Sequence, residues 1–596
     1  MAGMNDGSVL PIEAGLAFLL TPVGSQRIST AEDLSEEQRL FLETAQQFME
    51  KEVISRNEAI EHLDYGLLKS LMRSAGDVGL LAVDIPEKYG GLGLDKTTSA
   101  LVSEAVSVQG SFAVTFGAHV GIGTLPIVIF GTEDQKTRYL PSLATGEKIA
   151  AYCLSEPGSG SDAMGAKTTA RRDGDAFVLT GVKQWISNAA IADVFIVFAQ
   201  IDGRLFSAFI VERDWAGVSI GKEESKLGLK GSSTCQLILE DVRVPIANLL
   251  GDPGRGSVIA FNILNVGRYK LGVSAGGAAK RALTHATQYA AERKQFQTPI
   301  IQFPAIREKL ARIATFIFAN ESMGWRLCGA LDARISGLDR SGDDYSRLSA
   351  EILKDYTIEC SMLKVFASEG VWQALDEALQ IHGGYGYTRE YPIEQPLRDS
   401  RVNRIFEGTN EINRLLVPGT LFKRVLQGKL NLMPVMASVE AEIATGQPAC
   451  PPDDVDDLVL EKFMIEQAKK AFIYTSGAAA QKHMADLDQQ QEILLRLSDM
   501  LMYIWAADST ITRVQQYSER FGREKTGSRR AVVRVVATEA YRFVCESARD
   551  LACHLAANPE KMIAGIGRLC PYVASDIIAA RRQVAEHVAA AGRYPY

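Results

Sequence analysis

The hydrophobic pattern of the chain changes from helical to β-prone at the stretch Ile149-Ala150-Ala151-Tyr152-Cys153-Leu154-Ser155-Glu156-Pro157-Gly158-Ser159-Gly160-Ser161-Asp162. Its first half is short, apolar and β-prone, and its second half is rich in Gly and Ser, which is typical of a buried strand that ends in a loop. Similar segments follow at 168–172, 176–183, 194–200, 206–211 and 235–242. Because no long helical pattern lies between them, we predict an antiparallel β-barrel or sandwich.

Helical patterns flank this β region on both sides. From about residue 33 to 147, apolar residues recur at helical spacing, as in Leu67, Leu68, Leu71 and Met72. The helical period returns at about 256, where Val258–Phe296 reads as one long helix with a narrow face of small residues. Further helices fit 304–336, 344–380 and 410–427, which together predict a helical bundle.

A chain of 596 residues is too long for one core, so we expect several domains. The predicted fold class is α+β: an N-terminal helical domain, a middle antiparallel β-barrel or sandwich, a C-terminal helical bundle and an extra C-terminal helical domain. We place the boundaries at an N-terminal extension 1–32, an N-terminal helical domain 33–147, a middle β domain 148–250, a bundle 251–428, a linker 429–456 and an extra domain 457–596.

The composition excludes some classes of function. The net charge of −8 argues against nucleic acid as the main partner. The eight cysteines show no CxxC spacing, which fits reduced thiols in a cytosol-like compartment, and the seven histidines do not cluster, so no metal site is indicated.

Membrane signals are weak. The apolar patch Ala14–Leu20 has no basic region before it and is too short to span a bilayer. The segment Met433–Ile443 either dips into a membrane surface or, as we favour, packs as a linker helix. We therefore expect a cytoplasmic protein whose membrane contact is at most peripheral.

Two loops at strand ends have the composition of a ligand site. Gly158 and Gly160 let backbone amides turn outward, so the loop 152–162 can cradle an anion or the polar edge of a planar ring. The stretch Gln184-Trp185-Ile186-Ser187-Asn188 places an indole beside a hydroxyl, which can flank a flat cofactor. The plainer alternatives are an ordinary strand-end turn and a core tryptophan.

Three further stretches lie in the helical region. Asn265 and Arg268 share one helix face and can orient together toward a polar ligand. Glu292-Arg293-Lys294-Gln295-Phe296 ends that helix with basic residues, which either complement the helix dipole or contact phosphate. Gln380-Ile381-His382-Gly383-Gly384-Tyr385-Gly386-Tyr387 has more glycines than a helix stop needs, which allows close approach to a ligand.

A carboxylate stands out in Arg404-Ile405-Phe406-Glu407-Gly408-Thr409-Asn410-Glu411-Ile412. Glu407 follows an apolar pair and precedes a helical pattern, so burial raises its pKa while the helix N-terminus lowers it. A carboxylate between such influences can act as a general base. The alternative is a charge that complements the helix dipole.

With these motifs in order, the sequence closely resembles the acyl-CoA dehydrogenase family over roughly residues 35–425. The matching elements are YCLSEPGSGSDAMG at 152–165, KQWISN at 183–188, NVGR at 265–268, ERKQF at 292–296, QIHGGYGYTREYP at 380–392 and RIFEGTNEI at 404–412. The extra helical unit makes the chain similar to the very-long-chain subgroup and its longer bacterial relatives.

The resemblance implies FAD between the sheet and the bundle, partly across a subunit boundary of a homodimer. It implies flavin contacts from Tyr152, Cys153, Leu154, Ser155, Gly160, Ser161, Trp185, Ile186 and Ser187. Thr409 and Glu411 touch the adenosine end of the cofactor. Arg293 and Phe296, with Gln380 and Gly384 from a neighbouring subunit, hold the pyrophosphate and adenine portions. The acyl-CoA substrate meets Ser161, Asn265, Arg268 and Gly408.

In the family's reaction, Glu407 removes the α-proton of a thioester, the β-hydride goes to FAD and the electrons pass to an electron-transfer flavoprotein. A branch of the family places its base just before the arginine matched by Arg268; here that residue is Gly267, which cannot act as a base. Pro304 replaces a glutamine common in the family, which puts one flavin contact in doubt.

We expect long straight-chain acyl-CoA as the substrate. The alternatives are an acyl-CoA oxidase that uses oxygen and a non-catalytic assembly protein on the same fold.

Overall fold

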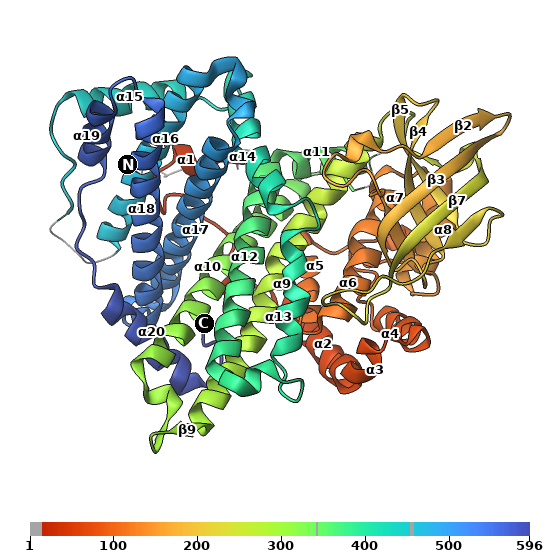
Figure 1. The fold of residues 1–596 in the computed structure, drawn as a ribbon, viewed down its shortest axis with the longest axis horizontal. Coiled ribbons are helices and arrows are strands. Elements are labelled where there is room, and N and C mark those ends of the chain that lie inside the picture. The colour runs from red at the N-terminus through yellow and green to blue at the C-terminus, as the bar shows by residue number, and fades with distance from the viewer. Residues whose placement is uncertain (1–14, 341, 343, 453–457) are drawn as a thin grey trace, which may run out of the picture.

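The computed structural model describes residues 15–340, 342, 344–452 and 458–596. A bundle of long helices occupies the middle of the molecule, a β sheet lies on one side of it, and a further group of helices lies on the other (Figure 1). The architecture is the predicted α+β arrangement.

The N-terminal helices begin at side-chain caps. Ser35 and Gln38 bond to each other's backbone at the start of α2, and Thr132 and Gln135 do the same at α8, which satisfies the free N–H groups of a helix start. After the short α1 (Ala17–Leu20), the helices are α2 (Glu36–Phe48), α3 (Asn57–Glu61), α4 (Tyr65–Asp77), α5 (Lys96–Val106), α6 (Gly110–Gly117), α7 (Leu125–Phe130) and α8 (Glu133–Ala144).

One stretch among the described residues, Gly110–Phe130, is long and apolar enough to cross a membrane by length and composition. It is divided into α6, a π turn at Ala118–Gly123 and α7, and 67% of its apolar 18-residue window is buried inside the fold, as in a core helix. His119 joins it to the sheet, because its ring accepts a hydrogen bond from Ala150 N at 3.0 Å and donates to the Leu143 carbonyl at 2.9 Å.

The middle domain is an eight-stranded sheet with the order β6-β7-β3-β2-β4-β5-β8, and β1 also pairs with β4. The strands are β1 (Ala150–Cys153), β2 (Thr169–Asp173), β3 (Ala176–Ser187), β4 (Val194–Ile201), β5 (Leu205–Glu212), β6 (Val218–Ile220), β7 (Thr234–Pro245) and β8 (Leu249–Leu250).

The sheet is mixed, whereas we predicted antiparallel pairing throughout. Pairs such as β3–β7 and β4–β5 are antiparallel, but β1–β4 and β2–β4 are parallel. A parallel pair needs a long crossover connection, and the β2–β3 hairpin lies within the connection from β1 to β4. Strands β6 and β8 are too short to show a period in the sequence.

The bundle is built around α9 (Gly256–Glu292), which follows most of the predicted long helix and then ends at the hairpin of β9 (Lys294–Gln295) and β10 (Thr298–Pro299). The other bundle helices are α10 (Pro304–Ile335), α11 (Tyr345–Asp355), α12 (Thr357–His382), α13 (Glu394–Ser400) and α14 (Asn410–Leu426). The predicted helix 344–380 is two helices, because the backbone leaves the helical conformation at Tyr356. At Gly277 on α9 an added Cβ would lie 2.2 Å from the Glu104 carbonyl oxygen, so α5 and α9 touch closely.

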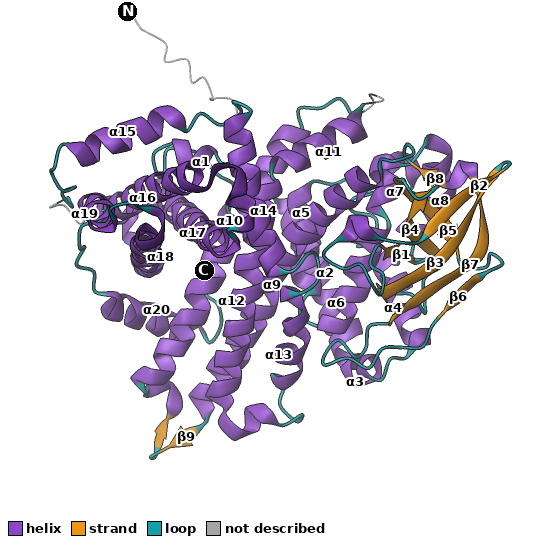
Figure 2. Cartoon of the chain, turned by 45° about the horizontal axis from the view of Figure 1, so that its top comes forward, coloured by secondary structure: helices purple, strands orange, loops and turns teal. Residues whose placement is uncertain are grey.

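The extra C-terminal helices pack against α10 and α14 of the bundle (Figure 2). They are α15 (Met433–Ala444), α16 (Val459–His483), α17 (Gln491–Phe521), α18 (Gly527–Leu555), α19 (Pro559–Leu569) and α20 (Ile577–Ala591). Buried ion pairs join the two parts, including Arg326 with Asp508 at 2.7 Å and Arg513 with Glu321 at 3.0 Å. Helix α15 packs on α16, where Glu442 pairs with Lys470 at 2.7 Å.

Candidate active site

Glu407 lies in a tight turn between the 3-10 turn Arg401–Arg404 and α14. Its φ is +57°, which is rare for a residue with a side chain, and Gly408 follows at +76°. The Thr409 side chain caps α14 by accepting a hydrogen bond from Ile412 N at 3.2 Å. Such a strained turn persists only when its surroundings fix it, and strain of this kind gathers at functional sites.

The turn directs the Glu407 side chain against α9. A Cβ added to Gly267 would lie 2.5 Å from Glu407 Cδ, so only glycine at this position of α9 leaves room for the carboxylate. Gly267 cannot itself act as a base, and its missing side chain leaves the space that the Glu407 carboxylate occupies.

Burial dominates the electrostatics of Glu407. Oε2 is buried without a hydrogen-bond partner among the described residues, although the side chain keeps some exposure toward a cavity. Desolvation raises the pKa of Glu407 to about 7, and the nearby charges of Arg268 and Lys364 oppose this rise. A carboxyl with such a pKa is poised to accept a proton near neutral pH.

Glu407 opens into a cavity of about 420 Å³. Gly267 of α9 lines it beside the carboxylate, and Ser187 of the sheet is also among its lining residues. From there the cavity follows one face of α9, whose lining residues Leu271, Ser274, Ala275, Ala278 and Ala282 are mostly small.

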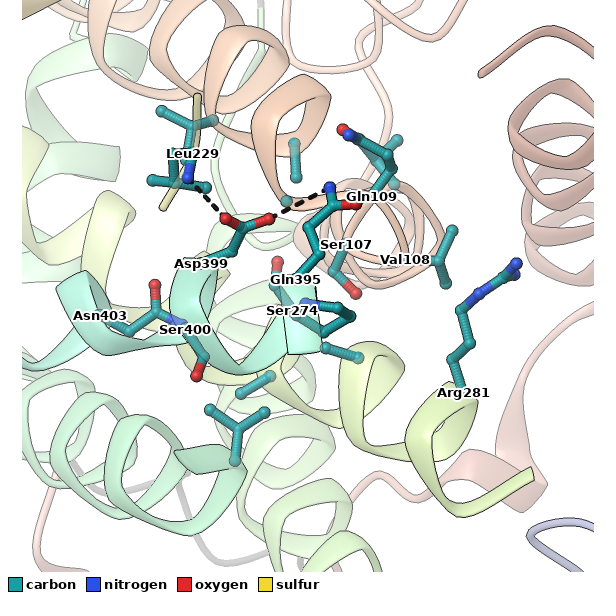
Figure 3. Close-up of a pocket in the computed structure, with 18 of the residues that line it drawn as sticks. Ser107, Val108, Gln109, Leu229, Ser274, Arg281, Gln395, Asp399, Ser400 and Asn403 are labelled. Atoms are coloured by element: carbon teal, nitrogen blue, oxygen red, sulfur yellow. Dashed lines mark hydrogen bonds between the residues drawn. The ribbon is translucent and has the colours of Figure 1, made fainter. Parts of the chain in front are cut away.

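The far end of the cavity is more polar. Figure 3 shows Ser274 and Arg281 on α9, with Gln109 and Asp399 on the facing elements. Asp399 accepts hydrogen bonds from Leu229 N at 2.5 Å and from Gln395 at 3.5 Å, and burial raises its pKa to about 7. Asp399 thus ties a loop of the sheet domain to α13.

The predicted flavin contacts of the sheet lie together at strand ends. Tyr152, Cys153, Leu154 and Ile186 are buried, Ser155 and Ser187 are half-buried, and Gly160 and Ser161 are exposed in the loop. Trp185 is 61% exposed and has a φ of +60°, within an irregular part of the β3–β7 pairing. A flat aromatic face is therefore open to a ligand at the edge of the site.

A buried ion pair that the sequence motifs did not reveal supports this loop. Lys183 Nζ contacts Glu156 Oε1 at 2.6 Å, and Glu156 also accepts hydrogen bonds from Lys167 N and Thr168 N. In the sequence, the sign of this ion pair is a lysine, Lys183, at a position of a strand that faces the interior.

Asn265 and Arg268 are brought together, as predicted, but beneath the Glu407 turn. Arg268 Nη1 donates to Asn265 Oδ1 at 3.0 Å and its Nε donates to the Glu407 carbonyl at 3.2 Å. Asn265 in turn donates to Thr357 at 2.9 Å, and both side chains are buried. Gly408 lies against the Arg268 guanidinium, whereas Glu411 is exposed on α14.

Four predicted cofactor residues lie elsewhere. Arg293 is separated from Gly267 by roughly 40 Å, at about 1.5 Å per residue along α9 and its end. Its guanidinium stacks on the Tyr385 ring at 5.4 Å, and Gln380 and Gly384 are exposed nearby on α12 and the turn after it. Phe296 is 90% exposed on the β9–β10 hairpin. This group therefore lies far from the Glu407 end of the cavity, although the Tyr385 ring packs at 5.0 Å against Tyr391, which lines the cavity.

Comparison with known proteins supplies a family. Models of the acyl-CoA dehydrogenase N-terminal domain, middle domain and C-terminal domain match residues 35–147, 151–242 and 254–421, and a further model of an acyl-CoA dehydrogenase C-terminal domain matches 467–564. A Bacillus subtilis protein named probable acyl-CoA dehydrogenase is 44% identical over 98% of both chains.

Two further relatives bear on the site. The crystal structure of an acyl-CoA dehydrogenase complexed with FAD from Bacillus anthracis superposes with a TM-score of 0.96 at 45% identity, and covers 98% of this chain and 100% of that one. The mouse very long-chain specific acyl-CoA dehydrogenase is 37% identical over 64% of this chain and 58% of its own. The chain belongs to the acyl-CoA dehydrogenase family.

Proposed function

We propose that this chain is an FAD-dependent dehydrogenase of long straight-chain acyl-CoA, with Glu407 as the base that removes the α-proton. One observation carries the proposal. The buried, unpartnered Oε2 of Glu407 faces a cavity that the N-terminal helices and the bundle line, together with Ser187 and Leu229 of the middle domain.

The residues at the sheet edge fit a flavin. The exposed face of Trp185 can flank a ring, the Ser187 hydroxyl lines the cavity, and a Cβ at Gly160 would meet no described atom within 4 Å. When bound, FAD supplies the acceptor for the hydride that leaves the β-carbon. Residues 152–155, Gly160, Ser161, 185–187, Thr409 and Glu411 would hold it from this chain.

A second copy of the chain would complete the cofactor site. Four exposed residues support this: Arg293, Phe296, Gln380 and Gly384 lie far from the Glu407 end of their own cavity. In a homodimer these residues would contact the FAD of the partner.

Two groups of the Glu407 turn serve the substrate. The carboxylate takes the α-proton, while the Glu407 backbone N–H, which bonds to no described acceptor, donates to the thioester carbonyl. Such a donor stabilises the negative charge that develops on that oxygen as the proton leaves. The apolar walls exclude water, which strengthens this interaction.

The shape of the cavity supports a long acyl chain. Its lining residues on α9 run from Gly267 to His285, which corresponds to roughly 27 Å at about 1.5 Å per residue. The acyl chains of one lipid leaflet span about 15 Å, half of a hydrocarbon core of about 30 Å. An acyl chain as long as those of membrane lipids therefore fits within this length, next to small side chains.

A chain-length panel tests the proposal. Under anaerobic conditions, palmitoyl-CoA should bleach the flavin absorbance faster than butyryl-CoA does, and a maximum at butyryl-CoA would refute the long-chain assignment. In air, turnover should need an electron-transfer flavoprotein; rapid peroxide release without it would identify an oxidase instead.

A further inference from the structure

Lys364 is a buried lysine that none of the sequence motifs singles out. It lies in the middle of α12, and its side chain is 0% exposed. Lysine is almost never fully buried unless it is paired with an opposite charge. Lys364 forms no ion pair with a carboxylate among the described residues, and the groups that accept its hydrogen bonds are neutral.

Both partners belong to the turn that carries Glu407. Lys364 Nζ donates to the Gly408 carbonyl at 2.8 Å and to Asn410 Oδ1 at 2.7 Å. Each partner accepts a hydrogen bond from the ammonium, so the contact holds the Gly408–Thr409 peptide and the first residue of α14.

Two cations therefore lie beneath one turn. Arg268 bonds to the carbonyl of Glu407 and Lys364 to the carbonyl of Gly408. Neither forms a direct bond to the Glu407 carboxylate, but that carboxylate is the main source of negative charge for both, since it is the largest charge–charge influence on each. The charges act across a dry interior, where they are weakly screened.

We propose that Lys364 is a positioning residue for the base: it fixes the left-handed turn, and its ammonium charge keeps the Glu407 carboxylate ionised. The inference rests on the proposed role of Glu407. It adds a group on α12 that touches neither substrate nor cofactor and acts through the base.

The charges around Lys364 oppose one another. Glu407 from the turn, Glu411 from α14 and Glu369 from α12 favour the ammonium, while Arg268 from α9 disfavours it. Burial is the largest influence and lowers the pKa of Lys364 to about 7. Glu369 is itself neutralised by Arg414 at 2.7 Å and lies near Arg404, and Tyr152 of β1 faces Glu407.

The chain offers a matched control for the two parts of this role. Asn413 Nδ2 also donates to the Gly408 carbonyl at 2.8 Å, and to the Thr409 carbonyl at 3.0 Å, but it carries no charge. Lys364→Met removes a charged donor from the Gly408 carbonyl, whereas Asn413→Ala removes a neutral donor from the same atom.

The experiment measures the pH profile of anaerobic flavin reduction by palmitoyl-CoA in FAD-loaded protein. Lys364→Met should move the acid limb upward by about one pH unit or more, which gives roughly a fivefold or greater loss near pH 7 and recovery near pH 9. Asn413→Ala should leave the limb in place. An unmoved limb in Lys364→Met, or an equal displacement in both variants, would overturn the proposal.

A second readout does not depend on turnover. An infrared titration follows the carboxyl band that Glu407→Gln removes, and this band should titrate at higher pH in Lys364→Met than in the wild type. If Glu407→Gln keeps full turnover, the proposed function fails, but the titration still decides whether Lys364 acts on the carboxylate. Should Lys364→Met fail to fold, Lys364→Gln replaces it, since its amide is neutral and can still donate to Gly408.

Discussion

Replacing Glu407 by glutamine should make the protein more stable at alkaline pH. Burial raises the pKa of Glu407 from 4.5 to about 7. Below pH 4.5 the carboxyl is protonated in the folded and the unfolded chain, so it contributes no penalty there. As the pH rises toward about 7, the unfolded chain ionises first, and the free energy of unfolding falls. A pKa that is higher by one in the folded chain corresponds to about 1.4 kcal/mol, so the full loss is about 3 kcal/mol.

Glutamine does not titrate, so Glu407→Gln should escape this loss. We expect the free energy of unfolding of the variant, relative to the wild type, to increase by about 2–3 kcal/mol between pH 5 and pH 8. Urea unfolding followed by circular dichroism measures this difference, with both proteins matched for FAD content. Because the chain has several domains, the comparison uses the pH dependence of the difference, in which effects common to both proteins cancel. If both proteins lose stability in parallel, burial does not raise the pKa of Glu407 and the reasoning fails.

Three substitutions test other parts of the site. Gly267→Ala places a Cβ against Glu407 Cδ, at a spacing of 2.5 Å, and should lower kcat by roughly 100-fold while FAD stays bound, as steady-state kinetics and flavin absorbance can check. Lys183→Met leaves the buried Glu156 carboxylate unpaired and should cost about 3–5 kcal/mol in urea unfolding, whereas an unchanged midpoint would show that water solvates the pair. Ala278→Leu narrows the far half of the cavity and should reduce kcat/KM for palmitoyl-CoA by roughly tenfold or more with little change for butyryl-CoA; equal losses on both would place the acyl chain elsewhere.

The sequence predicts the domain order because each domain has its own hydrophobic period. The parallel pairing of β1 with β4 could not be predicted, since Ala150 and its partner Val194 are separated by a whole hairpin and local periodicity says nothing about pairing across such a distance. The break between α11 and α12 at Tyr356 was missed for a related reason: apolar spacing continues through it, and neither Gly nor Pro marks it.

Some features of the candidate site could likewise be predicted from the sequence, and others could not. Glu407 could be predicted because it precedes a glycine and a helical pattern in RIFEGTNEI, one of the six motifs that resemble the family. Its positive φ and its contact with Gly267 depend on how α9 packs, and the sequence holds no local sign of either. Lys364 could not be predicted from the sequence because a single lysine in a helix normally faces solvent. It is buried here because the 407–410 turn packs over it.

The central claim is that Glu407 is the base of an acyl-CoA dehydrogenase. Rapid anaerobic mixing of FAD-loaded protein with palmitoyl-CoA tests it most directly, with wild type and Glu407→Gln compared at about pH 8. We predict that the wild type bleaches, while the variant retains FAD and binds acyl-CoA but bleaches roughly 100- to 10,000-fold more slowly, the range that general base catalysis contributes. Bleaching of the variant at the wild-type rate, or no bleaching of the wild type by any acyl-CoA from short to long, would contradict the claim.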